Sequence, residues 1–352
     1  MLRATVTKKL GGFTLDVSIQ SDVRVTGLFG PSGSGKTTLL NCIAGLLDPE
    51  KGDIVFSDTP YFASDPPANR PIRERRVGYV FQDSLLFEHM SVRANLLYGR
   101  NRGGNGPGFD DVVDVLALGP QLARKPRELS GGEQRRVAIG RALLSNPAIL
   151  LFDEPLTGLD AALAGRVMVY LKRVLDRFAI PALYVSHSIS DVIYFCDEVV
   201  VLRDGRVVTQ GPPGEVITRR GVLDDRHLTD LRNVFTASDA NYDQEHAAVR
   251  CRIGPLELLV YSATPERTPT PTLAIRANDI ILAAARPERI SARNVLPATV
   301  QRVEPVGGKI LVFIDVGTTW IVEVGPAAVE ELSLKPGAAV FAVIKASAIE
   351  LL

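Results

Sequence analysis

Cysteine is scarce in this chain, and its scarcity argues against two kinds of stabilised fold. Only three cysteines occur among 352 residues, Cys42, Cys196 and Cys251. They lie far apart and lack the spacing of a metal-binding motif, so we expect neither a disulfide framework nor a zinc site. This usage favours a reducing compartment.

Long apolar runs are also absent from the sequence. The longest, such as AILLF (148–152) and IILAAA (280–285), fall well short of the roughly 18 apolar residues that a membrane span needs. The first residues, MLRATVTKKLGG, have no apolar core like that of a signal peptide. We therefore expect a cytosolic protein, or one attached to a membrane only through a partner.

The chain has no excess of either charge. Lys plus Arg and Asp plus Glu both number 40, which gives no reason to expect a nucleic-acid partner. The most basic run, NRPIRERR (69–76), is interpreted as a solvated face. With 46% hydrophobic and 23% charged residues, the composition is that of a globular protein, and 352 residues predict two or three domains.

The first part of the chain alternates apolar runs with helix-like segments. Strands are predicted at 24–30, 148–154 and 180–187, and helices at 36–47, 161–178 and 189–196. Residues 198–211 read as a hairpin that turns at Asp204-Gly205. This alternation predicts an α/β layer with a mostly parallel sheet.

The pattern weakens from about Leu223 and becomes β-rich after about Ala247. Short runs separated by Gly/Pro turns predict a small barrel, preceded by a Pro/Thr loop at 264–272. We find no internal repeat. The expected divisions are residues 1–230, then 231–288 as a linker with the first strands of the second part, then 289–352.

A phosphate-binding loop stands near the start. GPSGSGKTT follows a buried strand and opens a helix, so glycine N–H groups and the helix end can surround phosphates. Lys36 would reach the β- and γ-phosphates, and the Thr37 hydroxyl would bind Mg²⁺. The residues expected to contact nucleotide here are Gly30, Pro31, Ser32, Gly33, Ser34, Gly35, Lys36, Thr37 and Thr38.

Two acidic residues end the apolar run AILLFDEP (148–155). Neighbouring side chains at a strand end point in different directions, so the two acids need not share a role. We assign Asp153 to Mg²⁺ and Glu154 to polarising the attacking water. Alternatively, Glu154 only caps the next turn.

The run LSGGEQRRVAIGRALL (129–144) suggests a second anion site. Ser130 and Glu133 form a capping box for a helix that carries Val137 and Leu144 inward. Capping does not require Gly131 and Gly132, which leave N–H groups bare at a positive helix end. Because the first loop already surrounds one phosphate group, the second would serve a nucleotide held by another subunit.

LSGGEQ resembles the signature of ATP-binding-cassette (ABC) ATPases, and the other motifs of that family follow in order over residues 1–230. YVFQD resembles the Q-loop, with Gln82 as its glutamine. LTGLD (156–160) resembles the D-loop and ends at Asp160, while YVSHS contains His187 as the switch histidine. The resemblance implies an α/β P-loop cassette with a helical subdomain, bound to ATP and Mg²⁺.

The resemblance also implies a head-to-tail homodimer with two ATP molecules between the subunits. Lys36, Gln82, Asp153, Glu154 and His187 of one subunit would face the signature residues of the other. Catalytic roles fall to Glu154, His187 and Gln82, and Gln82 would also sense the metal. The further nucleotide contacts expected are Ser130, Gly131, Gly132, Gln134, Asp160 and, by stacking on adenine, Phe13, which is alternatively a core residue.

Two classes of ABC ATPase remain open. One drives a membrane importer, and the other acts on DNA, ribosomes or Fe–S assembly. The sequence shows no heptad run, a single cassette and no net charge, and the segment LLFEHMSVRANLLYG (85–99) resembles the part of importers that receives a permease helix. We favour an importer subunit on the cytoplasmic face of a membrane, linked indirectly to a periplasmic oxyanion-binding protein.

The last residues point to the cargo. SARNVLPATVQRV (291–303) and VIKASAIELL (343–352) resemble the two ends of a Mop-like, molybdate-binding OB-like barrel. Its ligand would be molybdate or tungstate, held by N–H and O–H donors and positive charge from Ser291, Arg293, Asn294, Lys345 and Ser347. A purely structural dimerising barrel, and importers of sulfate, thiosulfate, iron or sugar, are the alternatives. With one copy of the motif pair, a closed site would need the second subunit.

Overall fold

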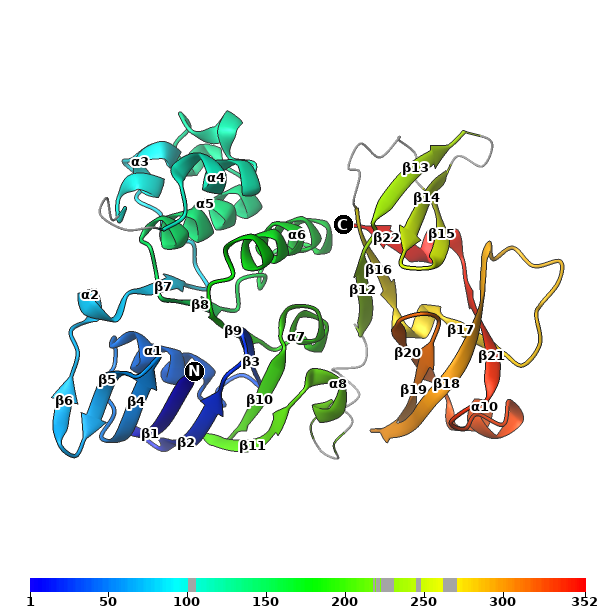
Figure 1. Cartoon of the computed structure of the whole chain (residues 1–352), viewed down its shortest axis with the longest axis horizontal. Helices are drawn as coiled ribbons and strands as arrows, with labels where there is room; N and C mark the ends of the chain where they lie inside the picture. Colours follow the sequence, from blue (N-terminus) through cyan, green and yellow to red (C-terminus); the bar gives the residue numbers. More distant parts are fainter. Residues whose placement is uncertain (101–105, 218, 220–221, 223–230, 245–247, 262–270) are drawn as a thin grey trace. The chain divides into compact units, whose positions relative to one another are not determined.

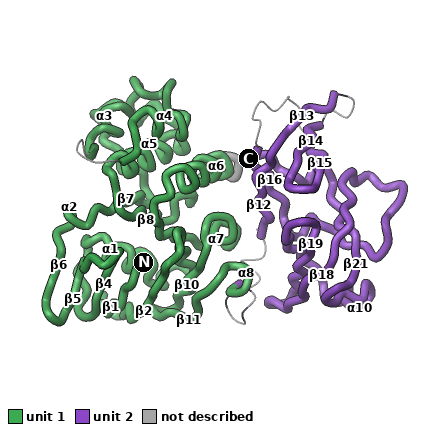
Figure 2. The backbone as a smooth tube through the Cα atoms, viewed as in Figure 1, with its two compact units in different colours: residues 1–216 green, residues 217–352 purple. Residues whose placement is uncertain are grey.

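The computed structural model describes residues 1–100, 106–217, 219, 222, 231–244, 248–261 and 271–352. The chain divides into two compact units, Met1–Val216 and Ile217–Leu352 (Figure 2). The expected boundary at residue 230 and most of the expected Pro/Thr loop lie outside the described residues. The other expected boundary, at 288, falls inside the second unit. Each unit is described by itself.

Unit 1 is built on a mostly parallel sheet in the order β11-β10-β3-β9-β8-β7. Every residue of β3, β8 and β9 is buried, as expected for strands covered on both faces. All neighbours are parallel except β11, so the carboxyl ends of the other strands meet at one edge. The α/β prediction is confirmed. The strands are β3 (Val25–Phe29), β7 (Val77–Val80), β8 (Ile149–Asp153), β9 (Ala182–Ser186), β10 (Glu198–Arg203) and β11 (Arg206–Gly211).

The predicted hairpin is present between β10 and β11. Asp204 and Gly205 both have positive φ, 48° and 75°, as a two-residue turn of this hand requires. A side chain at Gly205 would also place a Cβ 2.0 Å from the carbonyl oxygen of Thr14. Glycine is therefore needed here for conformation and for space.

An antiparallel sheet, β2-β1-β4-β5-β6, forms a second layer of unit 1. Helix α1 (Lys36–Ala44) packs between the sheets, since Leu39, Leu40 and Ile43 share one core with both. The strands are β1 (Leu2–Leu10), β2 (Phe13–Ser21), β4 (Lys51–Phe56), β5 (Thr59–Ser64) and β6 (Pro67–Asn69).

A helical subdomain of α3, α4 and α5 gathers on one side of unit 1, at the top of Figure 1. Within the described ranges, no helix is both long and apolar enough to cross a membrane. The remaining helices are α2 (Ile72–Arg75), α3 (Val92–Leu97), α4 (Phe109–Val115), α5 (Gly131–Leu144), α6 (Ala161–Phe178), α7 (Ile189–Phe195) and α8 (Pro213–Val216).

Unit 2 is β-rich, as predicted, and its core surrounds the fully buried Trp320. Among its described residues it has one short α-helix, α10 (Pro326–Glu331), and two 3-10 helices, Ala277–Asp279 and Ala346–Ala348. The strands are β12 (Arg232–Thr236), β13 (Asp239–Asp243), β14 (Ala248–Ile253), β15 (Leu256–Tyr261), β16 (Thr272–Arg276), β17 (Ile281–Ala283), β18 (Asn294–Val306), β19 (Lys309–Asp315), β20 (Thr319–Val324), β21 (Ala339–Ile344) and β22 (Ile349–Leu351).

Unit 2 contains two equivalent halves, so the expectation of no internal repeat is wrong. In the second half, β17-β21-β18-β19-β20 form one sheet. In the first, β22-β16-β12 and β13-β14-β15 follow the same order, with β12 and β13 together matching the long β18. The last strand of each half pairs with the other half, β17 with β21 and β22 with β16. The repeat is hard to see in the sequence because few side chains are shared.

Candidate functional site

The predicted phosphate loop joins the carboxyl end of β3 to α1. Gly30, Gly33 and Gly35 have φ of 155°, 79° and 102°, values that side-chain-bearing residues rarely adopt. A Cβ on Gly30 would lie 2.1 Å from the carbonyl oxygen of Leu202. The loop therefore keeps a backbone cradle that only glycine allows. Pro31 and Ser32 are exposed beside it, and Thr38 is half-buried on the first turn of α1.

Two polar side chains in this cradle lack the partner that a phosphate would supply. Lys36 folds back, and its Nζ donates to the carbonyl oxygens of Gly30 at 2.8 Å and Pro31 at 2.9 Å. The Oγ of Ser34 is buried and has no hydrogen-bond partner. Burial lowers the pKa of Lys36, against the opposing effect of Glu154 and Asp153. The residues present fit the phosphates of a nucleotide.

The two residues assigned to Mg²⁺ lie side by side. The Thr37 hydroxyl donates to Oδ1 of Asp153 at 3.0 Å. Burial raises the pKa of Asp153, while hydrogen bonds from Thr37 and Tyr79 oppose that shift. A hydroxyl and a carboxylate are oxygen ligands that suit Mg²⁺, with the phosphates and water completing its shell.

Tyr79 is a site residue that the sequence interpretation missed. Its hydroxyl donates at 3.3 Å to Oδ2 of Asp153 and lies 3.0 Å from Oδ1 of Asn41 on α1. Tyr79 thereby holds the carboxylate oxygen that Thr37 does not contact. Its position on β7, three residues before Gln82, is the only signal that the sequence offers.

Glu154 and His187 meet directly at the same sheet edge. Oε2 of Glu154 lies 3.1 Å from Nδ1 of His187 and accepts from the Thr157 hydroxyl at 3.0 Å. The hydrogen bond to His187 lowers the pKa of Glu154, and the same bond raises the pKa of His187. The loop that carries His187 is fixed by Asp191, which accepts from the Ser186 hydroxyl at 3.0 Å.

Gln82 is exposed two residues beyond β7, at the edge that also carries Asp153. The chain around it is attached to α5 through backbone carbonyls. Arg135 donates to Phe81 at 2.8 Å, and Arg141 donates to Leu85 at 2.9 Å. Movement of this segment would therefore act on α5.

The amino end of α5 forms the capping box that the sequence predicts. Ser130 Oγ accepts from the Glu133 N–H at 3.3 Å, and Glu133 accepts from the Ser130 N–H at 2.8 Å. Ser130 and Gly131 are exposed, whereas a Cβ on Gly132 would lie 2.4 Å from Leu163 of α6. The Gln134 amide donates to the Pro126 carbonyl at 3.0 Å, so it braces the loop before the helix.

Two further residues expected to contact nucleotide, Asp160 and Phe13, lie on separate elements. Asp160 is exposed and caps α6 by accepting from the Leu163 N–H at 3.0 Å. Phe13 is partly buried at the start of β2, where a Cβ on Gly35 would lie 3.0 Å from its ring. Phe13 therefore lies against the phosphate loop and also packs on the core of unit 1.

The predicted oxyanion residues of unit 2 are divided by their burial. Ser291, Arg293, Lys345 and Ser347 are exposed. Asn294 is buried, and its amide pairs with the backbone of Leu259, accepting at 2.7 Å and donating at 2.9 Å. Asn294 faces Ile344 across the β18–β21 ladder, which places the next residues, Arg293 and Lys345, at the same strand ends.

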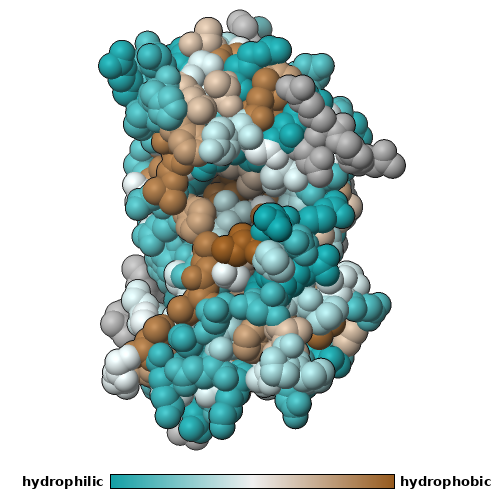
Figure 3. Space-filling model, turned by 90° about the vertical axis from the view of Figure 1, so that its left-hand side faces the viewer, coloured by the Kyte–Doolittle hydropathy of each residue, from teal (hydrophilic) through white to brown (hydrophobic). Residues whose placement is uncertain are grey.

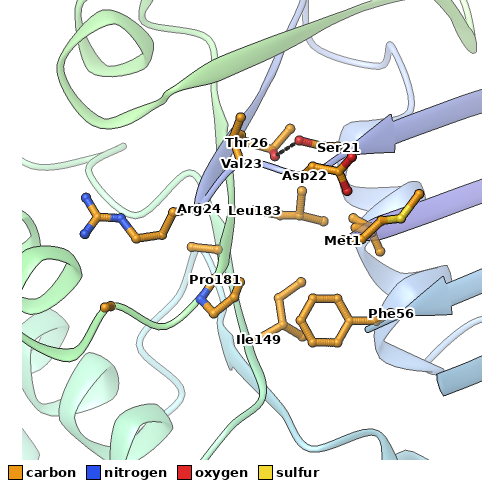
Figure 4. A pocket seen from close by; sticks show the side chains of 13 residues that line it. Met1, Ser21, Asp22, Val23, Arg24, Thr26, Phe56, Ile149, Pro181 and Leu183 are labelled. Atoms are coloured by element: carbon orange, nitrogen blue, oxygen red, sulfur yellow. Dashed lines mark hydrogen bonds between the residues drawn. The ribbon is translucent and has the colours of Figure 1, made fainter. Parts of the chain in front are cut away.

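A cavity of about 320 Å³ lies at the opposite edge of the parallel sheet, where β3, β8 and β9 begin (Figure 4). Its lining is mainly apolar, with Ser21 and Thr26 hydrogen-bonded to each other at 2.8 Å. It is remote in the fold from the phosphate loop, which follows the other end of β3. The cavity therefore takes no part in the nucleotide site.

Comparison with known proteins finds one family model that matches unit 1 and another that matches unit 2. The ABC transporter family model matches residues 14–157, and the TOBE domain model matches residues 290–351. A molybdenum import ATP-binding protein, ModC, of Rhizobium etli is 40% identical over 97% of this chain and 98% of that protein. The protein of the same name from Vibrio parahaemolyticus is 37% identical over 95% of this chain and 92% of its own length.

Solved structures match the first unit. A nucleotide-free ATP-binding cassette from an ABC transporter has a TM-score of 0.55 and 28% identity, covering 63% of this chain and 96% of its own. A dimeric cassette bound to ADP and Pi has a TM-score of 0.50 and 28% identity, covering 60% and 99%. Together with the site geometry, these matches confirm the resemblance: the chain belongs to the ATP-binding proteins of ABC transporters, among the molybdenum import group.

Proposed function

We propose that this chain is the ATP-hydrolysing, energy-coupling subunit of an ABC importer for molybdate, with tungstate as a second cargo of the same shape and charge. The observation that carries the proposal is the match to molybdenum import ATP-binding proteins over 97% of the chain. This match includes both the unit that holds the nucleotide site and the unit that holds the proposed oxyanion residues. The names of the relatives compared above favour molybdate over the alternatives, which are sulfate, thiosulfate, iron and sugar.

In this proposal the chain acts as a head-to-tail homodimer. Ser130 and Gly131 are exposed at the positive amino end of α5, and they belong to a subdomain separate from the chain's own phosphate loop (Figure 1). A second copy would bring its nucleotide to them. ATP is then bound by both subunits, so binding favours the closed dimer and loss of phosphate favours the open one.

Hydrolysis falls to the residues at the carboxyl edge of the sheet. Thr37, Asp153 and Gln82 would hold Mg²⁺, which neutralises charge on the phosphates. Lys36 orients the phosphates, Glu154 accepts a proton from the attacking water, and His187 steadies Glu154 and the γ-phosphate.

The permease would dock on the face of unit 1 near α2 and α3. Large apolar side chains stay exposed on α2, after Gln82 and after α3, namely Ile72, Leu85 and Tyr98. Figure 3 shows apolar surface around a hollow on the side of the molecule that carries β6 and α2. An apolar patch of this kind marks a protein partner. In this proposal the chain lies on the cytoplasmic face of the membrane, bound to the permease.

Unit 2 would sense the cargo after import. Arg293 and Lys345, with the hydroxyls of Ser291 and Ser347, supply donors and positive charge for a dianion. The Asn294 amide is already occupied by Leu259, so its part is to fix the strand that carries Arg293. Oxyanion bound here would favour the open dimer and slow further import.

The test is uptake by the chain with its permease in vesicles. We expect ATP-driven accumulation of molybdate and tungstate but not of sulfate. Glu154→Gln should bind ATP and dimerise but lose about 100-fold or more of its hydrolysis rate. Normal turnover by that variant would remove Glu154 from its role, and uptake of sulfate alone would overturn the cargo.

A further inference from the structure

The two halves of unit 2 match at the residues proposed for oxyanion binding. Arg232-Asn233-Val234 opens the first half as Arg293-Asn294-Val295 opens the second. Ile275-Arg276-Ala277 leads into one short 3-10 helix, Ala277–Asp279, and Ile344-Lys345-Ala346 leads into another, Ala346–Ala348. Backbone φ and ψ agree within a few degrees there, −67° and 141° at Arg276 against −68° and 139° at Lys345.

Buried asparagines fix both copies in the same way. Asn233 accepts from the N–H of Ile321 at 2.7 Å and donates to its carbonyl at 2.8 Å. Asn294 does the same with Leu259 of the other half, at 2.7 and 2.9 Å. Each asparagine thus joins its own half to the opposite one, and the arginine before it is held at an equivalent strand end.

The two equivalent strand ends, one in each half, differ in charge. Arg232 lies opposite Arg276 across the β12–β16 ladder, as Arg293 lies beside Lys345. Arg232 donates to Glu350 of the exchanged strand β22 at 2.7 Å. The residue that matches Glu350 is Ile281 of β17, since Ile281 pairs with Val343 as Glu350 pairs with Ala274. A carboxylate therefore neutralises the first cationic end, and an isoleucine stands at that place in the second.

We propose that unit 2 carries two equivalent cationic ends, of which only the Arg293–Lys345 end binds an oxyanion, because Glu350 closes the other by holding Arg232. This inference rests on the proposed oxyanion function and deepens it. A carboxylate excludes a dianion by repulsion and by occupying the guanidinium donors. Removing that charge would release, at the first end, the guanidinium donors that Glu350 occupies.

The test measures molybdate stoichiometry on the full chain by calorimetry, with Mg·ADP in excess so that the phosphate loop is already filled. Glu350→Gln should about double the number of molybdate ions bound per chain. A chain that carries only Arg293→Gln should bind no molybdate, and the double variant with Glu350→Gln should recover binding at the first end. Glu330→Gln, an exposed acid of α10 in the same unit, is the matched control and should change nothing.

The outcomes separate the two proposals. If the unaltered chain binds molybdate through Arg293 but Glu350→Gln leaves the stoichiometry unchanged, the closed end is refuted and the sensor stands. If neither the unaltered chain nor Glu350→Gln binds molybdate, the closed end and the sensor role are both refuted. If only Glu350→Gln binds, Glu350 is a block and the assignment of the open end is wrong. Trp320 fluorescence checks folding, and Glu350→Ile, which copies the residue at position 281, repeats the test if the glutamine variant unfolds.

Discussion

The contact between Glu154 and His187 orients the carboxylate that we propose as the catalytic base. Oε2 of Glu154 is shared between the imidazole and the Thr157 hydroxyl, so the proposed base is already oriented. The imidazole gains from the charged form of its partner, which raises its pKa. Because its folded-state pKa is raised, His187 contributes stability that is complete below the unfolded-state pKa and is lost as pH rises through the folded-state pKa.

This contact predicts a measurable shift. Glu154→Gln removes the carboxylate, so the pKa of His187 should fall relative to that in the unaltered chain. The proton NMR titration of the imidazole signals measures it, with His187 assigned through His187→Gln. The signals of the other histidines serve as the control and should not move. An unchanged His187 titration would show that Glu154 does not hold the imidazole in solution.

Arg75 shows that residue type alone does not decide burial. The basic run 69–76 was interpreted as a solvated face, yet Arg75 is 1% exposed. Its Nη1 donates to the carbonyls of Cys42 at 2.8 Å and Ile43 at 2.9 Å, which are carbonyl groups in the last turn of α1. Its Nε donates to the Arg70 carbonyl at 2.9 Å. A buried cation thus neutralises the negative end of the helix whose other end holds the phosphate loop.

At the scale of elements, the carboxyl end of α1 therefore depends on a side chain that is distant in the sequence. Arg75→Met should lower the free energy of unfolding of unit 1 by about 3 kcal/mol, because several buried carbonyls lose their donor. Arg73→Met is the matched control, since Arg73 and Arg75 both lie on α2. Its side chain is 85% exposed, and we expect a change within about 0.5 kcal/mol.

Circular dichroism during urea unfolding follows unit 1 in this experiment. The only tryptophan, Trp320, lies in unit 2, so its fluorescence reports the other unit and should be unaffected. Equal destabilisation by the two arginine variants would contradict the capping role.

For the whole molecule, the exchange of terminal strands makes unit 2 one folding unit. β17 completes the sheet of the second half, and β22 completes that of the first. The two halves also share a single core, which includes Leu273 and Ile275 from one and Val312 and Trp320 from the other. Residues 289–352, although expected as a domain of their own, lack β17, one of the two strand partners of β21.

Residues 217–352 should therefore fold alone with Trp320 buried, whereas residues 289–352 should not fold as a monomer. Two copies of the shorter fragment can complete each other, since β22 of one matches the β17 that β21 of the other lacks. Circular dichroism and sedimentation over a range of concentrations measure this. A folded, monomeric 289–352 at low concentration would contradict the prediction.

The sequence by itself determined the chemistry that lies in contiguous residues. The phosphate loop, the acids after β8, the capping box and the turn at Asp204-Gly205 depend on neighbouring residues, so their patterns predict both structure and role. The strand and helix alternation likewise predicted the α/β layer, because periodicity reflects burial.

Only the tertiary structure decided contacts between distant positions. Tyr79 of β7 reaches Asp153 of the neighbouring β8, Arg75 reaches the end of α1, and the Asn294 amide pairs with Leu259. The exchange of β17 and β22, and the placement of Glu350 on Arg232, likewise join residues far apart in the chain. Such pairings arise from how packed elements meet, and no local pattern of side chains specifies them.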